Sequence, residues 1–291
     1  MTQKRAGFSI NPDTGVLMPN EPPPDISGHV VILNANAKLP RIVDEIQLGS
    51  SDDPLDIIVV IQNWETWLEN EEWRPRGRYR GNIYFREGHV AATEDLELAR
   101  IELAKVAVVL ADPLQGDLAD AHSTLTAVAI ENLNPMIHTV VELISSVNRV
   151  HLKYTKVNEV VCIGELTEKL IAQSCISPGV KNIFDHLLSA RSDTTQIFTI
   201  NVPPAMSGKT FREVMRLTIE RDAPFVLCGF STTNGNFGNG LPVDRITVVN
   251  PRTDSEPGKD TIMGPSDTLV AIAYKKTEID KFFSQHNDLS N

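Results

Sequence analysis

The stretch 28-GHVVILNANAKLPRIVDEIQ-47 decides the fold class. It opens with a continuous apolar run of strand length, and residues 37–47 then carry apolar side chains at helical spacing. A strand that is apolar on both faces and leads directly into a helix is typical of a parallel sheet covered by helices. The stretch therefore predicts the first strand and the first helix of a βαβ unit.

The same alternation continues along the chain. Further strands are expected at 55–62, 80–88, 105–112, 136–145 and 157–164, with helices at 95–104 and 120–134. Short apolar strands separated by amphipathic helices predict an α/β protein with a Rossmann-like, doubly wound parallel sheet.

Composition narrows the class of protein further. Apolar residues make up 41% and charged residues 22% of the 291 residues, which is typical of a globular chain. No apolar run approaches the roughly 18–20 residues of a membrane helix, and no apolar segment follows the basic residues near the N-terminus, so we expect neither a spanning helix nor a signal peptide. The net charge of −11 disfavours nucleic acid as a partner. The widely spaced Cys162, Cys175 and Cys228 are expected to be reduced thiols of a cytoplasmic protein.

The two ends of the chain and its second half do not continue the alternation of parallel strands and helices. Residues 165–194 predict two helices with apolar stripes, interrupted at Ser177-Pro178-Gly179, which could pack on their own sheet or dock against another molecule. Residues 195–283 predict strands around one helix at 210–222, a small α+β lobe. We expect residues 1–27, which are rich in proline, to form a flexible arm, and residues 284–291 a tail.

Taken in order, these segments resemble the RCK family, the regulators of potassium conductance of Trk/Ktr type. The resemblance rests on 94-EDLELARIELAKVAVVLADP-113, 164-GELTEKLIAQSCISPGVKNIFDHLLS-189, 200-INVPPAMSGKTFREV-214 and 264-GPSDTLVAIAY-274. It covers roughly residues 28–283. It implies a Rossmann-like N-lobe at 28–164, a helix-turn-helix crossover at 165–194 and a C-lobe at 195–283.

The resemblance also implies a function and partners. RCK modules are cytoplasmic ligand sensors that gate a membrane potassium pore, carried by the same gene product or by a separate subunit. They form homodimers through the crossover, and the dimers build tetrameric or octameric gating rings at the inner face of the membrane. In this chain the implied dimer interface comprises Leu170, Ile171, Ile183, Phe184 and Leu187.

The loop after the first strand departs from the family's glycine-rich phosphate cradle. The three glycine positions fall on Asn34, Asn36 and Leu39, and the second strand ends at Gln62 without an acidic residue for a ribose hydroxyl. Asparagine tolerates a left-handed backbone. Leu39, however, has a side chain at the position where a glycine allows the helix to pack closely against the strand. NAD binding is therefore not expected, and Asn34, Asn36 and Gln62 mark a degenerate nucleotide cleft. This loss resembles the channel-attached branch of the family.

A cluster of acidic residues follows the fourth strand. Asp112, Asp117 and Asp120 could supply oxygens to calcium at the carboxyl edge of the sheet, and channel-type relatives use acidic residues in this neighbourhood. His89 stands where the family has an acidic position, and together with His122 it could suit a softer metal. In the alternative interpretation, Asp117 or Asp120 only caps the following helix.

Other motifs are weaker. SGKT at 207–210 lacks the first glycine of a P-loop, because Pro203 stands there, so Thr210 is expected to cap a helix. Trp64, Trp67 and Trp73 suggest a solvated helix with inward tryptophans, or a contact with an anionic ligand or another subunit.

The expected function is therefore a regulatory gating module, with calcium as a candidate ligand, and not an enzyme. We find no catalytic signature in the sequence. The alternatives are a nucleotide-binding Rossmann protein or NAD-dependent oxidoreductase, and a constitutive assembly scaffold without a ligand.

Overall fold

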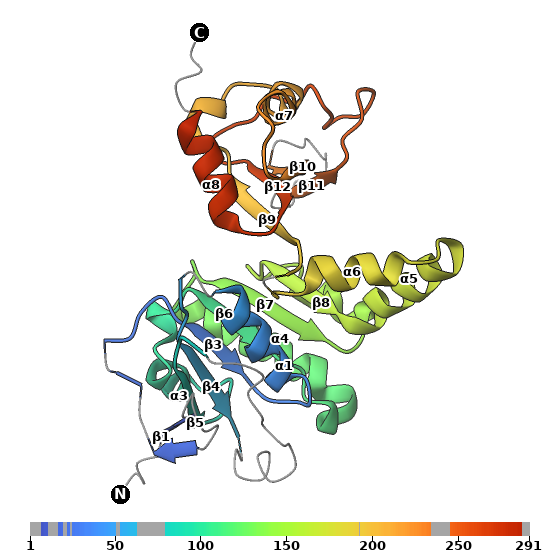
Figure 1. Cartoon of the computed structure of the whole chain (residues 1–291). Coiled ribbons are helices and arrows are strands. Elements are labelled where there is room, and N and C mark those ends of the chain that lie inside the picture. Colours follow the sequence, from blue (N-terminus) through green and yellow to red (C-terminus); the bar gives the residue numbers. More distant parts are fainter. Residues whose placement is uncertain are drawn as a thin grey trace, which may run out of the picture. The chain divides into compact units, whose positions relative to one another are not determined.

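The computed structural model of the chain describes residues 7–10, 17–19, 22–23, 25–50, 53–62, 79–191, 193–233 and 245–286. The chain divides into two compact units, residues 1–178 and residues 179–291 (Figure 1). Each unit has its own apolar core. The tryptophans of the predicted helix, Trp64, Trp67 and Trp73, lie outside the described residues.

The first unit is built on a sheet whose six central strands are parallel. Their order is β5-β4-β3-β6-β7-β8, so the strand order reverses at β3. This confirms the doubly wound, Rossmann-like sheet expected from the sequence. The strands are β3 (Val30–Leu33), β4 (Ile57–Ile61), β5 (Ile83–Glu87), β6 (Val106–Val109), β7 (His138–Leu143) and β8 (Glu159–Cys162).

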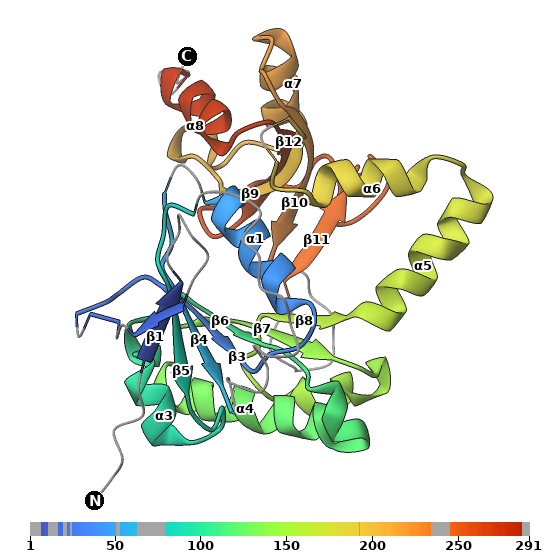
Figure 2. The same ribbon diagram turned by 60° about the horizontal axis from the view of Figure 1, so that its bottom comes forward.

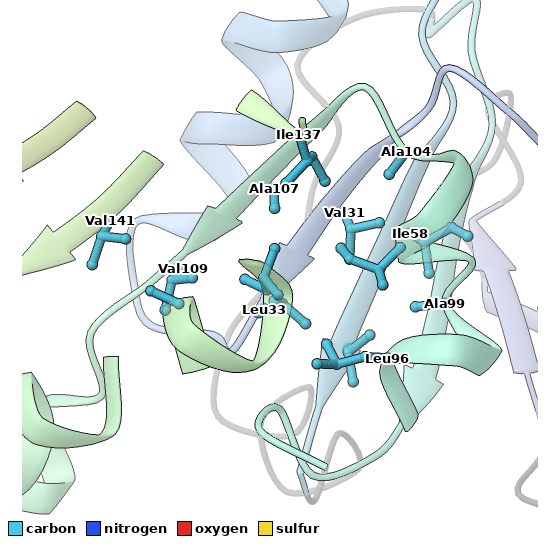
Figure 3. Close-up of a cluster of buried hydrophobic side chains, with 14 of the residues drawn as sticks. Val31, Leu33, Ile58, Leu96, Ala99, Ala104, Ala107, Val109, Ile137 and Val141 are labelled. Atoms are coloured by element: carbon cyan, nitrogen blue, oxygen red, sulfur yellow. The ribbon is translucent and has the colours of Figure 1, made fainter. Parts of the chain in front are cut away.

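Helices cover both faces of this sheet because the central strands are apolar on both sides. Figure 2 shows α1 (Leu39–Gly49) on one side, and α3 (Thr93–Leu98) and α4 (Ala119–Leu133) on the other. Along β3, Val31 and Leu33 pack with Leu96 and Ala99 of the α3 region, as Figure 3 shows. The alternate residues of β3 face the core that contains α1. The expected helix at 95–104 is in fact α3 followed by the 3₁₀ turn η1 (Ile101–Leu103).

Two more strands lie in the region where we expected a flexible arm. β1 (Gly7–Ile10) pairs antiparallel with β5, and β2 (Leu17–Pro19) pairs antiparallel with β1. The expected arm over residues 1–27 therefore contains two paired strands that extend the sheet at one edge.

The second unit contains a four-stranded antiparallel sheet in the order β11-β10-β12-β9. Its helices α7 (Phe211–Glu220) and α8 (Lys276–Gln285) pack on one face, where their side chains join the core. The sequence analysis missed α8, although Ile279, Phe282 and Phe283 lie at helical spacing and are buried. The strands are β9 (Gln196–Asn201), β10 (Val226–Thr232), β11 (Ile246–Val249) and β12 (Thr268–Ala273).

The remaining elements connect these layers. Between β6 and β8 lie the 3₁₀ segments η2 (Pro113–Leu118) and η3 (Ser146–Leu152), and η4 (Pro204–Met206) precedes α7. The two predicted crossover helices are α5 (Ile163–Ile176), at the end of the first unit, and α6 (Val180–Leu188), at the start of the second. Within the described part of the chain, no helix is both long and apolar enough to cross a membrane.

Candidate functional site

The carboxyl edge of the parallel sheet is the natural place for a site, because strand order reverses there between β4 and β6. The loop from β3 to α1 and the end of β6 meet at this edge. The backbone N–H of Leu110 donates to the Leu33 oxygen (2.9 Å), and the side-chain amide of Asn34 donates to the Leu110 oxygen (3.3 Å). Asn34 has a φ of 73°, so it adopts the left-handed conformation expected at the first glycine position.

Asn36 connects the loop after β3 to the two strands on the other side of the reversal point. It is buried, and its amide nitrogen donates to the Ala111 oxygen (2.8 Å) and to Oε2 of Glu142 (3.1 Å). Its amide oxygen accepts the backbone N–H of Lys38 (3.0 Å). Both N–H groups and the oxygen of this side chain are therefore engaged within the protein.

Glu142 on β7 lies at the centre of this arrangement, and the sequence analysis did not identify it. Its side chain is almost completely buried, and Oε2 also accepts the backbone N–H of Ala111 (3.1 Å). Oε1 forms an ion pair with the ammonium group of Lys38. The only local signal was a single glutamate within the otherwise uncharged strand 138-HTVVEL-143.

The start of α1 does not provide a phosphate cradle. Leu39, at the third glycine position, is fully buried in the core beneath the helix. Pro40 stands in the first turn and has no N–H to offer. Gln62, the third residue of the predicted degenerate cleft, is exposed just after the end of β4. The helix N-terminus therefore presents fewer donors than a dinucleotide-binding loop does.

The acidic residues after β6 are engaged with protein donors. Asp112 caps η2, where Oδ1 accepts the backbone N–H of Leu114 (3.0 Å) and Oδ2 accepts Nε2 of Gln115 (3.0 Å). Asp120 is buried in the first turn of α4, but its side chain makes no cap to that helix. The capping interpretation is therefore wrong for Asp120.

Asp120 instead holds the segment that follows β7. Its carboxylate accepts the backbone N–H groups of Ile144 (2.7 Å) and Ser145 (3.0 Å), and the side-chain amide of Asn148 (2.6 Å). These three bonds attach the start of η3 to the start of α4. Three of the roughly four lone-pair positions of this carboxylate are therefore used within the protein.

The predicted metal residues do not gather into a site among the described side chains. His89 and His122 are both exposed, the first after β5 and the second on α4. Asp117 lies in η2, and its side chain is outside the description. Across the residues that the structure describes, no group of three or more His, Cys, Asp or Glu side chains could hold a metal ion. The described residues therefore do not form a ready calcium site, and a cation site at Asp112, Asp117 and Asp120 stays a prediction.

The crossover helices expose the apolar residues predicted for the dimer interface. Neither α5 nor α6 contains a buried residue. On α5, Ile171 is 61% exposed and Leu170 is partly exposed. On α6, Ile183 is 57% exposed, Phe184 is 39% exposed and Leu187 is partly exposed. The alternative in which these stripes pack on the chain's own sheet does not describe these helices.

A second exposed apolar set lies on neighbouring elements of the first unit and was missed by the sequence analysis. Leu118, the last residue of η2, and Leu125 of α4 are both more than half exposed, and so are Val147 and Val150 of η3. Asp120 links the start of α4 to η3, and we call these four exposed residues the α4–η3 face. Sequence periodicity could not find this face because α4 carries apolar side chains on both its buried and its exposed sides.

Two buried titratable groups lie away from the sheet edge described above. Burial lowers the pKa of His29, whose Nε2 bonds to the Ala99 oxygen (3.0 Å) and whose Nδ1 has no partner within the described residues. Burial and then the hydrogen bond to Asp44 raise the pKa of Tyr79 well above its usual range. The hydroxyl of Tyr79 therefore stays protonated and anchors α1 through Asp44.

Comparison with known proteins shows which domains the first unit resembles. Residues 25–141 match the family described as the calcium-activated potassium channel slowpoke-like RCK domain. The predicted resemblance to RCK domains is confirmed over these residues. Over 194 residues, 65% of its length, it is 27% identical to the calcium-gated potassium channel TvoK of Thermoplasma volcanium. The chain spans about half of that relative, 51% of its length.

Solved structures show a more distant likeness to the chain. The crystal structure of the GsuK RCK domain is 16% identical, with a TM-score of 0.38 over 92% of this chain and 48% of that one. The GsuK channel bound to NAD is also 16% identical, with a TM-score of 0.39 over 92% of this chain and 39% of that one. With TM-scores below 0.5, neither likeness bears on what this chain binds, so the expectation that NAD does not bind is not confirmed and stays a prediction.

Proposed function

We propose that this chain is the ligand-sensing regulatory module of a potassium channel or transporter and acts as a homodimer or larger ring beneath a membrane pore. The observation that carries this proposal is the exposure of the crossover: α5 and α6 have apolar residues at helical spacing, and none of these residues is buried. Such helices gain stability only when a partner covers them. A second copy of the chain is the partner that the similarity of residues 25–141 to RCK domains supports.

The α4–η3 face supports assembly beyond the dimer. A two-fold interface is self-complementary and closes at two subunits, so a ring of dimers needs a second, independent contact. Leu118, Leu125, Val147 and Val150 provide an apolar surface on elements other than α5 and α6. We therefore assign the crossover to the dimer and the α4–η3 face to the contact between dimers.

The mass of the particle in solution tests this assignment. Phe184→Glu on α6 places a charge in the proposed dimer contact and should convert the wild-type assembly to smaller particles, as measured by light scattering or sedimentation. Leu125→Glu should leave dimers but remove larger rings. Ile219→Glu is the matched control, because Ile219 is a helical residue of the second unit that is 72% exposed and outside both surfaces. If Phe184→Glu keeps the wild-type mass while remaining folded, the assignment of the crossover is wrong.

For the ligand, the proposal keeps the divalent cation predicted from the sequence, with calcium as the example. Its support is the acidic cluster at Asp112, Asp117 and Asp120, together with the description of TvoK as calcium-gated. A ligand acts on such a module by binding one arrangement of the assembly more tightly than another.

The test is to measure the melting temperature and the mass with and without millimolar calcium. Magnesium at the same concentration is the control for ionic strength. A calcium-specific rise that Asp112→Asn weakens supports the cation. The same melting temperature and the same mass in both salts would show that calcium is not the ligand, without contradicting the proposed assembly.

A further inference from the structure

The carboxylate of Glu142 is held at the carboxyl edge of the sheet as a bound anion would be. Only 7% of the residue is exposed, and its three partners are the Lys38 ammonium group, the Asn36 amide and the Ala111 backbone N–H. Removing a charged group from water is unfavourable, so charged groups are buried only when they are paired and hydrogen-bonded. The set consists of one cation and two neutral donors, which is the chemistry of an anion site.

The donors come from the two segments on which α/β proteins bind ligands. Asn36 and Lys38 lie in the loop between β3 and α1, and Ala111 lies just after β6. Strand order reverses between these segments, and in Rossmann-like sheets a ligand phosphate binds at this point, near the N-terminus of the first helix. In this chain a side chain from β7 supplies the anion.

We propose that Glu142 is a built-in anion that fills the phosphate position of this crevice and closes it to free anionic ligands such as nucleoside diphosphates. Two further features of the described residues agree with this. The backbone N–H of Lys38 is already bonded to Asn36, and Pro40 removes another donor from the first turn of α1. The hydrogen-bond donors of the crevice are already bonded to protein groups, so they are not available to an entering phosphate. The negative charge of Glu142 would also repel the phosphate.

The proposal predicts a latent site for small anions. Glu142→Ala removes the carboxylate but leaves the Lys38 ammonium group, the Asn36 amide and the Ala111 N–H facing the vacated space. Formate or acetate has the charge and the planar carboxylate of the missing group. Either anion should bind there and stabilise the variant by linkage.

The experiment compares melting temperatures in sodium formate and in sodium chloride at equal ionic strength. Formate should raise the melting temperature of Glu142→Ala by about 5 °C more than chloride does, with saturation. The wild type and Glu142→Gln, which keeps the space filled, should show no formate-specific rise. Lys38→Met in the Glu142→Ala background should abolish the effect. An equal formate effect in the wild type and in Glu142→Ala would overturn the proposal.

A second measurement covers the case in which Glu142→Ala folds poorly. Refolding of this variant in formate but not in chloride would itself support the latent site. In parallel, ADP and inorganic phosphate are titrated into the wild type by calorimetry, and the proposal expects no binding heat. Saturable binding of either probe that Lys38→Met removes would show an open anion site and would overturn the proposal.

Discussion

Replacing Asp120 with alanine tests whether this carboxylate is a structural link or a cation ligand. The side chain is buried and accepts three hydrogen bonds, at 2.7 Å from Ile144, 3.0 Å from Ser145 and 2.6 Å from Asn148. A hydrogen bond to a charged group contributes about 1.5–3 kcal/mol, and bonds within one network are not additive. Ile144 and Asn148 are not fully buried, so water can replace part of what is lost. We therefore expect the free energy of unfolding to fall by about 3 kcal/mol.

The assay is thermal unfolding in calcium-free buffer. For a domain of this size, a loss of about 3 kcal/mol lowers the melting temperature by roughly 6–12 °C. Asp112→Ala is the comparison, because Asp112 only caps a short, largely exposed 3₁₀ segment and should cost about 1 kcal/mol. A melting temperature of Asp120→Ala within about 1 °C of the wild type, together with loss of a calcium-dependent rise, would refute the structural role and identify Asp120 as a ligand.

Three further predictions concern stability. Gly81→Ala should cost on the order of 3 kcal/mol in urea unfolding, because its Cβ would lie 2.1 Å from the Leu55 oxygen, whereas Gly164→Ala, whose nearest contact is 3.9 Å away, should be neutral or slightly stabilising. Thr210→Ala should destabilise the second unit by about 1 kcal/mol, since it removes the capping box with Glu213, and a serine at the same position should restore most of this. Because burial lowers the pKa of His29 below 6.5, the unfolded chain takes up the proton first. Stability should therefore fall as the pH drops from 6.5, by at most about 1.4 kcal/mol per pH unit, and the slope should flatten when His29 is replaced by glutamine.

The sequence predicted the elements of this fold well because its strands are buried on both faces. A strand such as Ile57–Ile61, with every residue buried, leaves a continuous apolar run that no surface helix would carry. Local chemistry was equally informative at Thr210, where a threonine followed three residues later by a glutamate indicates a helix start. α8 was missed because it buries only three apolar residues and is otherwise polar or charged.

The candidate site could be predicted only in part, because its partners are far apart in the sequence. Asn36 was identified from its place in the loop after the first strand, but its partner Glu142 is 106 residues away, and no local pattern relates the two. Asp120 was identified as acidic and near the sheet edge, yet its bonds to Ile144 and Asn148 depend on how η3 folds back onto α4. Residue type indicated where polar chemistry lies, whereas only the tertiary structure shows which donors a carboxylate accepts.

The crevice occupied by Glu142 and the exposed apolar surfaces of α5 and α6 both agree with the proposed regulatory module, which acts through contacts between its copies. A ligand shifts a conformational equilibrium only if it binds the two states differently, and a crevice whose donors already bond to Asn36 and Glu142 offers a free anion little to discriminate. In the proposed assembly, by contrast, the apolar residues of α5 and α6 change from exposed to buried, at about 25 cal/mol for each Å² covered. Covering a few tens of Å² differently in two arrangements of such an interface amounts to about 1 kcal/mol, which is the scale of allosteric coupling. In the proposed assembly the free energy for switching therefore resides in the surfaces between copies, and a regulatory ligand would act by favouring one arrangement of those surfaces over the other.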